Sequence, residues 1–174
     1  MMEPTRIIFV SGGQRSGKSV LAENIALSLS DRPVYIATAR IYDDETRRRV
    51  DVHRRRRGDR WTTIEAPVSL DFGLAPGDVA LMDCLTMFAT NHFFDAGEDA
   101  DVAYDAVVAE LERLLSRSDG ATLVIVSNEI GLGGVPANAM QRHFTDLQGR
   151  LNQWVAARAD EAWLSVSGLP LRLK

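Results

Sequence analysis

The sequence predicts an α/β fold with a mostly parallel central sheet flanked by helices, and two observations carry this prediction. The pattern G-x-x-x-x-G-K-S occupies residues 12–19, between the apolar run Ile7 to Val10 and a stretch with helical spacing. Four further apolar runs follow, separated by segments of helical or loop character. Strands that alternate with helices in this way form parallel sheets. A phosphate-loop pattern in the first strand–helix turn indicates a P-loop NTPase domain of the RecA-like type.

The first strand–helix–strand unit is the best defined. Ile7 to Val10 should be a strand buried on both faces, because its apolar residues do not alternate with polar ones. A helix should follow the loop to about Ser30, and Val34 to Thr38 should form the next strand. This spacing is typical of a right-handed βαβ unit. We therefore expect Thr38 and Ala39 to lie beside the phosphate loop, beyond the carboxyl ends of the strands.

The rest of the chain continues the alternation. A helix at residues 43–57 has few aliphatic residues, so it should lie on the surface, over a cleft or against a partner chain. The other expected elements are an extended segment at 61–65, a connector at 67–76, a strand at 78–83, helices at 84–91 and 102–116 around an acidic loop, a strand at 121–127, a glycine loop at 130–136, a helix at 138–158, a strand at 162–167 and a short edge at 171–173.

The phosphate loop consists of Gly12, Gly13, Gln14, Arg15, Ser16, Gly17, Lys18 and Ser19. Its glycines let successive backbone N–H groups point inward, and the helix N-terminus adds a partial positive charge. Lys18 should reach the β- and γ-phosphates of a nucleotide, and the Ser19 hydroxyl should bind Mg²⁺. A glycine-rich turn that serves only as a connector is the alternative, and the flanking strand and helix favour phosphate binding.

Two other strand ends carry polar residues. Asp83 ends an apolar strand, where phosphate-loop enzymes place a carboxylate that holds Mg²⁺ directly or through water. The alternative is that Asp83 caps the following helix. Asn128 and Glu129 follow the strand at 121–127 and precede a glycine loop, so they should lie on the active-site side. A long connector with incidental glycines is the alternative there.

Composition limits the class of protein. A chain of 174 residues is expected to form a single domain over residues 1–174. No apolar run is long enough to span a bilayer, the N-terminus lacks a signal-peptide pattern, and the single Cys84 fits the reducing cytoplasm. The net charge is −4, yet residues 47–60 carry eight arginines against two aspartates. Because the remainder is acidic, a local anion site is favoured over a general nucleic-acid surface.

His53 lies in the middle of the basic segment. Arg49 and Arg57 are four residues away on either side, so all three share one helical face. Neighbouring guanidinium groups favour the neutral imidazole, which suits nucleophilic attack on a phosphate. A solvated histidine on a charged surface is the alternative. His92 and His143 lack such surroundings and should be structural or surface residues.

Motifs along nearly the whole chain resemble those of one family. They are Gly12 to Ser19, Tyr35 to Ala39, Asp43 to Glu45 with His53, Trp61, Glu65, Asp83 to Thr86, Ser127 to Gly131, Val135-Pro136, Arg142 to Phe144, Asp146, Gly149-Arg150, Asn152-Gln153 and Gly168 to Lys174. The family that they resemble is the bifunctional adenosylcobinamide kinase/adenosylcobinamide-phosphate guanylyltransferase family of cobalamin biosynthesis. This sequence departs from the family's usual pattern at Gly134 and Phe88, where a larger apolar residue and a tryptophan are common.

The resemblance implies two reactions. In the first, the γ-phosphate of ATP or GTP passes to the hydroxyl of the aminopropanol arm of adenosylcobinamide. In the second, His53 attacks the α-phosphate of GTP and releases pyrophosphate, and the GMP group then passes to adenosylcobinamide phosphate, giving adenosylcobinamide-GDP. Nucleotide contacts carry over to Gly12 through Ser19, to Ala37, Thr38 and Ala39, to Arg54, Arg55, Arg56 and Arg57, and to Glu65 and Asp83.

The resemblance also implies a homotrimer, in which the basic helix could face a neighbouring subunit. ATP and GTP are expected as substrates and Mg²⁺ as the cofactor, with no nucleic-acid partner and no membrane span. Two alternatives remain open from the sequence. One is a monofunctional P-loop kinase of a small molecule, and the other is a nucleotide-gated module that binds nucleic acid through residues 47–60.

Overall fold

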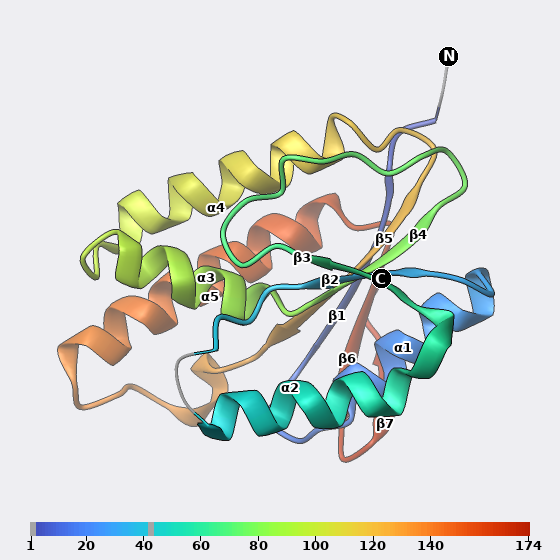
Figure 1. Cartoon of the computed structure of the whole chain (residues 1–174). Coiled ribbons are helices and arrows are strands. Elements are labelled where there is room, and N and C mark those ends of the chain that lie inside the picture. The colour runs from blue at the N-terminus through green and yellow to red at the C-terminus, as the bar shows by residue number, and fades with distance from the viewer. Residues whose placement is uncertain (1–2, 42–43) are drawn as a thin grey trace.

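The computed structural model describes residues 3–41 and 44–174, with the backbone alone for residues 45, 46, 49, 53, 54, 56 and 57. The described chain forms a seven-stranded sheet with the strand order β3-β2-β4-β5-β1-β6-β7 and helices on both faces (Figure 1). In chain order the elements are β1 (Arg6–Gly12), α1 (Lys18–Leu29), β2 (Val34–Ala37), α2 (Asp44–Arg57), the short 3₁₀ helix η1 (Gly58–Arg60), β3 (Thr62–Glu65), β4 (Val79–Asp83), α3 (Leu85–Asp95), α4 (Ala100–Leu115), β5 (Thr122–Asn128), the 3₁₀ helix η2 (Gly131–Gly133), α5 (Ala139–Arg158), β6 (Glu161–Val166) and β7 (Leu169–Arg172).

The sheet is parallel except at one edge. The pairs β1–β5, β1–β6, β4–β5, β2–β4 and β2–β3 are all parallel, and β7 pairs antiparallel with β6. The predicted α/β fold with a mostly parallel central sheet is therefore confirmed. Within the described residues, no helix is both long and apolar enough to cross a bilayer.

The strand order separates β1 from β2. β1 and β2 belong to the same parallel sheet, as the βαβ pattern predicts, but β4 and β5 lie between them. Both intervening strands are buried almost throughout, which suits central positions in the sheet. Thr38 and Ala39 therefore follow a strand whose neighbour is β4, where Ala37 pairs with Asp83, and their position beside the phosphate loop stays a prediction.

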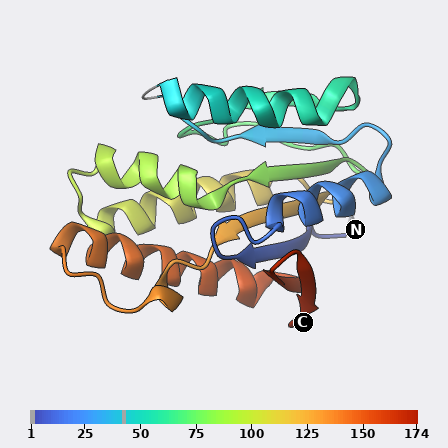
Figure 2. The ribbon, with the colours of Figure 1, turned by 90° about the horizontal axis from the view of Figure 1, so that it is seen from below.

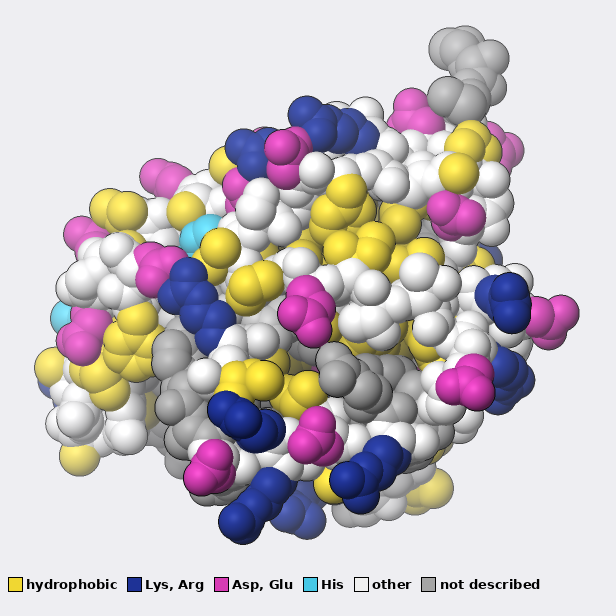
Figure 3. Space-filling model, in the orientation of Figure 1, with side chains coloured by type: hydrophobic (Ala, Val, Ile, Leu, Met, Phe, Trp, Pro, Cys, Tyr) yellow, Lys and Arg dark blue, Asp and Glu magenta, His cyan; other side chains and the backbone are white. Residues whose placement is uncertain are grey.

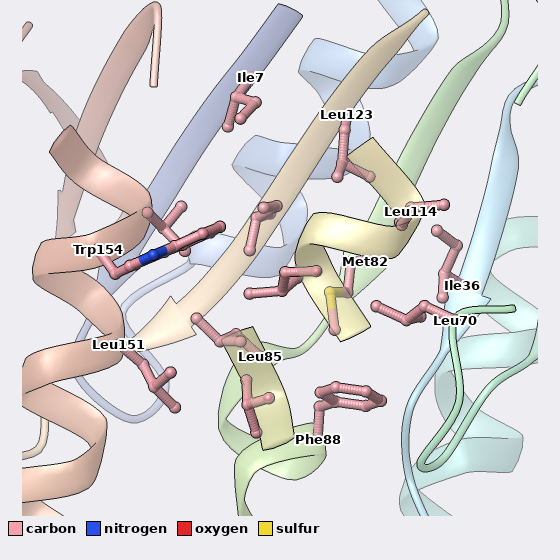
Figure 4. Packing of buried hydrophobic residues seen from close by; sticks show 14 of the residues in the cluster. Ile7, Ile36, Leu70, Met82, Leu85, Phe88, Leu114, Leu123, Leu151 and Trp154 are labelled. Atoms are coloured by element: carbon pink, nitrogen blue, oxygen red, sulfur yellow. The ribbon is translucent and has the colours of Figure 1, made fainter. Parts of the chain in front are cut away.

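Two hydrophobic cores lie on opposite faces of the sheet. Ile7 and Phe9 of β1 belong to the larger core, under α3, α4 and α5, while Ile8 and Val10 belong to the smaller core, under α1. Figure 4 shows the larger core, where Trp154 of α5 lies over the sheet. Two helices of the larger core, α4 and α5, begin with side-chain caps, since Asp99 accepts two N–H bonds of α4 and Asn138 accepts one of α5. Side chains of β1 are thus packed on both faces of the sheet, which fixes the position of the phosphate loop at the end of this strand.

The basic helix α2 stands apart from these layers. Figure 2 shows it beside the β2 edge of the sheet, on the opposite side of the molecule from α5 and the C-terminal hairpin. Val52 is 64% exposed and Val50 is half-buried, so the aliphatic residues of α2 add little to either core. The prediction of a surface helix here is confirmed over Asp44–Arg57, while Asp43 lies outside the described residues.

Candidate functional site

The phosphate loop joins the end of β1 to the start of α1, in the context that the motif requires. Gly12 sits in a tight place: a Cβ atom there would lie 2.5 Å from Ser16 Oγ and 2.7 Å from the carbonyl oxygen of Ser165. Gly17 has a φ of 95°, a left-handed conformation that a side chain disfavours. The two glycines of the motif are therefore required by the backbone geometry of the loop.

The turn between β6 and β7 braces this loop from outside the motif. The backbone carbonyl of Ser16 accepts two hydrogen bonds, one from the Ser165 hydroxyl at 2.8 Å and one from the Gly168 amide at 2.7 Å. A Cβ atom on Gly17 would lie 3.1 Å from the Cα atom of Gly168. No local pattern pointed to Ser165, and Gly168 entered the sequence reasoning only through the family resemblance. These contacts fix the loop conformation from the C-terminal hairpin.

Lys18 lies in the loop, within electrostatic range of the end of β4. Its ammonium group donates a hydrogen bond to the Gly13 carbonyl at 3.0 Å. Burial lowers the pKa of Lys18. The nearby acidic groups of Cys84 and Asp83 favour the charged ammonium and oppose this shift. The loop lysine and the strand-end carboxylate, predicted from separate motifs, are thus close enough to interact. A bound phosphate would offer Lys18 a stronger, charged acceptor than the Gly13 carbonyl.

Asp83 is the candidate metal ligand at the end of β4. Its carboxylate accepts a hydrogen bond from the Tyr35 hydroxyl at 3.2 Å. Among the described residues there is no group of three or more His, Cys, Asp or Glu that could hold a metal ion without further ligands. Mg²⁺ in nucleotide sites is commonly held by one or two protein oxygens, phosphates and water. The Ser19 hydroxyl and the Asp83 carboxylate fit that donor set.

Thr38 has a structural role in addition to its predicted one. Its side chain is fully buried; Oγ1 donates to the Cys84 carbonyl at 2.8 Å and accepts from the Cys84 amide at 2.9 Å. Its carbonyl accepts from Asn91 at 2.8 Å. These bonds tie the end of β2 to the start of α3. Nucleotide contacts at Ala37, Thr38 and Ala39 stay predictions.

The other predicted residues lie on the β3 side of the sheet. Glu65 is exposed at the end of β3, where it pairs in register with Ala37. α2 carries His53 and the four arginines that follow it, and Arg55 is exposed there. The side chains of His53, Arg54, Arg56 and Arg57 lie outside the described residues. The predicted site residues therefore form two groups, with the phosphate loop at β1 and the second group near β2 and β3, and Asp83 lies on the strand between β5 and β2.

Glu129 was absent from the predicted nucleotide-binding and catalytic residues, yet it contacts the loop strand. Its amide donates to the Gly12 carbonyl at 3.0 Å, and its carboxylate accepts from Asn152 at 3.1 Å. Asn152 is held by buried partners in turn, because its Oδ1 accepts from the Ser127 hydroxyl at 2.6 Å and from Gln148 at 2.9 Å. The expectation that Asn128 and Glu129 lie on the active-site side of the sheet is consistent with the contact to Gly12.

Comparisons with known proteins address the identity of this fold and site. Over residues 8–173 the chain matches the model of a family described as "Cobinamide kinase / cobinamide phosphate guanyltransferase". It is 40% identical to the "Bifunctional adenosylcobalamin biosynthesis protein CobU" of Escherichia coli (strain K12), over 97% of this chain and 99% of that protein. It is 39% identical to the "Bifunctional adenosylcobalamin biosynthesis protein CobP" of Pseudomonas aeruginosa, over 95% of each chain.

A solved structure adds an independent comparison of the fold. A type III secretion ATPase superposes with a TM-score of 0.51 at 13% identity, over 92% of this chain and 51% of that one, which supports the P-loop NTPase fold alone. The resemblance read from the motifs is confirmed by the family match and by the curated relatives. The chain belongs to the cobinamide kinase / cobinamide phosphate guanyltransferase family.

Proposed function

We propose that this protein, acting as one domain, phosphorylates adenosylcobinamide with ATP or GTP and then transfers GMP from GTP to the product, giving adenosylcobinamide-GDP. The observation that carries the proposal is the phosphate loop with Lys18 within electrostatic range of Asp83, in a chain whose family is named for both reactions. The family match favours this function over a monofunctional kinase and over a nucleic-acid-binding module.

Phosphoryl transfer is assigned to the phosphate-loop half of the site. The hydroxyl oxygen of the corrinoid arm attacks the γ-phosphorus, the bond to the bridging oxygen breaks, and ADP or GDP leaves. The loop amides and Lys18 stabilise the charge on the transferred group, and Ser19 and Asp83 are the proposed Mg²⁺ ligands. When bound, Mg²⁺ offsets the negative charge of the phosphates.

Guanylyl transfer is assigned to His53. An imidazole nitrogen attacks the α-phosphorus of GTP, pyrophosphate leaves, and the phosphoramidate then yields GMP to a phosphate oxygen of the substrate, which restores the histidine. Arg54, Arg55, Arg56 and Arg57 are proposed to neutralise the phosphates, with Ala37, Thr38, Ala39 and Glu65 as further nucleotide contacts. The exposure of Val52 on a helix set apart from both cores supports a step in which α2 or the nucleotide changes position.

The surface of α2, the cysteine and the charge of the chain also support proposals on its assembly, its cellular setting and its partners. α2 has exposed apolar and basic residues, which suits a neighbouring subunit, so we propose a homotrimer; light scattering after gel filtration would measure it. The lone, partly buried Cys84 supports a cytoplasmic setting. The acidic remainder of the chain argues against a nucleic-acid partner.

Labelling at the α-phosphate of GTP tests the proposal. Incubation with the protein should leave an acid-labile, base-stable label, as expected for a phosphoramidate. His53→Asn should abolish the label and retain most kinase activity, while Lys18→Ala should severely reduce phosphoryl transfer. His143→Asn is a matched control, because His143 is exposed on α5. A label of equal extent in the His53→Asn variant would refute the assignment, and a wild-type protein with kinase activity but no label would be a monofunctional kinase.

A further inference from the structure

An apolar groove lies beyond the carboxyl edge of the sheet, between α3, α5 and the glycine loop. Its cavity measures about 280 Å³ and is lined by Thr90, Phe93, Phe94, Ile130, Pro136, Met140, Gln141, Phe144 and Thr145. Every one of these described lining residues is uncharged, although a quarter of the chain is charged. Figure 3 shows hydrophobic side chains on the surface over the outer ends of α3 and α5.

The inner end of the groove adjoins the phosphate loop through short connections. Ile130 follows Glu129, whose amide is bonded to the Gly12 carbonyl at 3.0 Å. Thr90 donates to the carbonyl of Thr86, one helical turn back, and Thr86 accepts from the Asn128 amide at 2.9 Å. A ligand in the groove would therefore extend toward the site where the γ-phosphate is transferred.

The outer end of the groove continues as an apolar rim. Phe94 is 50% exposed, and Leu132 and Val135 in the glycine loop are 78% and 88% exposed. Gly134 adds open space, because a Cβ atom there would meet nothing within 4 Å. A cavity of this size is at the lower end of small-molecule pockets, so it would hold one edge of a large ligand while the rim covers more of it.

We infer that this groove binds an apolar edge of the corrin ring and so positions the acceptor hydroxyl for phosphorylation. The inference rests on the proposed function, since the corrinoid is its substrate. A corrin ring is wide and methyl-bearing, and its side arms are uncharged amides, which matches a lining without charge. The lining offers no positive charge to the phosphates of a nucleotide, which bind instead at the phosphate loop and Lys18. The arm that carries the hydroxyl then points past Glu129.

Two groove variants test the inference by opposite changes. Phe94→Ala removes a half-exposed aromatic wall, and Gln141→Trp fills the groove from an exposed position on α5. Each should raise the KM for adenosylcobinamide about tenfold, which corresponds to about 1.4 kcal/mol. The KM for ATP and the kcat at saturating corrinoid should stay at wild-type values, because the loop is untouched.

Matched controls separate groove effects from general damage. Val102→Ala truncates another exposed apolar residue on α4, and Ala157→Trp places the same bulk on an exposed position near the other end of α5. Groove variants with the same corrinoid KM as these controls would overturn the inference. So would an equal rise in both KM values, or a change of oligomeric mass with unchanged KM, which would make the groove a contact between copies. Absence of kinase activity in the wild-type protein would instead refute the proposed function.

Discussion

Two neighbouring glycines of the phosphate loop should respond very differently to alanine. A Cβ atom on Gly12 would lie 2.5 Å from Ser16 Oγ and 2.7 Å from the Ser165 carbonyl oxygen. A Cβ atom on Gly13 would meet nothing within 4 Å, and Gly13 does not have a positive φ. We therefore expect Gly12→Ala to lower the free energy of unfolding and Gly13→Ala to leave it nearly unchanged.

The loss of stability in Gly12→Ala depends on which of the two close atoms can move away from the new Cβ atom. The Ser16 side chain can rotate away, but the Ser165 oxygen is part of β6, where Ser165 pairs in register with Gly12. The backbone must shift, so the loss should reach the upper part of the range for overpacking, about 2–3 kcal/mol. For a protein of this length that corresponds to a fall in Tm of about 4–12 °C.

Urea unfolding followed by circular dichroism measures both changes. An unchanged slope of the free energy of unfolding against urea concentration shows that the transition stays two-state. The double variant Gly12→Ala/Ser16→Ala removes the contact with Ser16 Oγ and keeps the contact with the Ser165 oxygen. It should recover part of the lost stability and no more. Equal losses at Gly12 and Gly13, or full recovery in the double variant, would refute the reasoning.

Two further predictions concern buried polar groups. Asn152→Leu should lower the free energy of unfolding by about 2–3 kcal/mol in urea titrations, because the buried Ser127 hydroxyl and Gln148 amide lose their shared acceptor; the exposed neighbour variant Gln153→Leu should not, and equal losses would contradict this. Burial, followed by the charge of Asp83, raises the pKa of the Cys84 thiol from 9.0 to about 12. The folded thiol should therefore resist iodoacetamide at pH 8. Because the unfolded thiol ionises at lower pH than the folded one, stability should fall between pH 9 and 12, and Cys84→Ala should remove that part of the fall.

The local features of this fold could be predicted from the sequence. Apolar runs and helical spacing predicted the strands, the long helices and the phosphate loop, because each depends on residues close in sequence. Asp83 was placed at a strand end by the same reasoning, and the structure brings it near Lys18. The basic helix α2 was expected on the surface from its few aliphatic residues, and its backbone is there.

What could not be predicted depends on distant segments. Periodicity does not give the order of strands, so the positions of β4 and β5 between β1 and β2 could not be predicted. The bonds from Ser165 and Gly168 to the Ser16 carbonyl join opposite ends of the chain. The contact between Glu129 and Gly12 likewise depends on the pairing of β5 with β1. None of these contacts has a local sequence pattern.

The position of β1 in the sheet has a consequence for synthesis of the chain. β1 is synthesised well before its partners, since Arg6 pairs with Thr122 of β5 and Ile8 with Glu161 of β6. Pairing over such separations slows folding, because a long loop must close before the contact forms. The anchor of the phosphate loop at Gly168 forms only after the segment with β6 and β7 has been made. A nascent chain therefore acquires an organised phosphate loop only after the β6–β7 hairpin has paired, and nucleotide binding can report that this hairpin is in place.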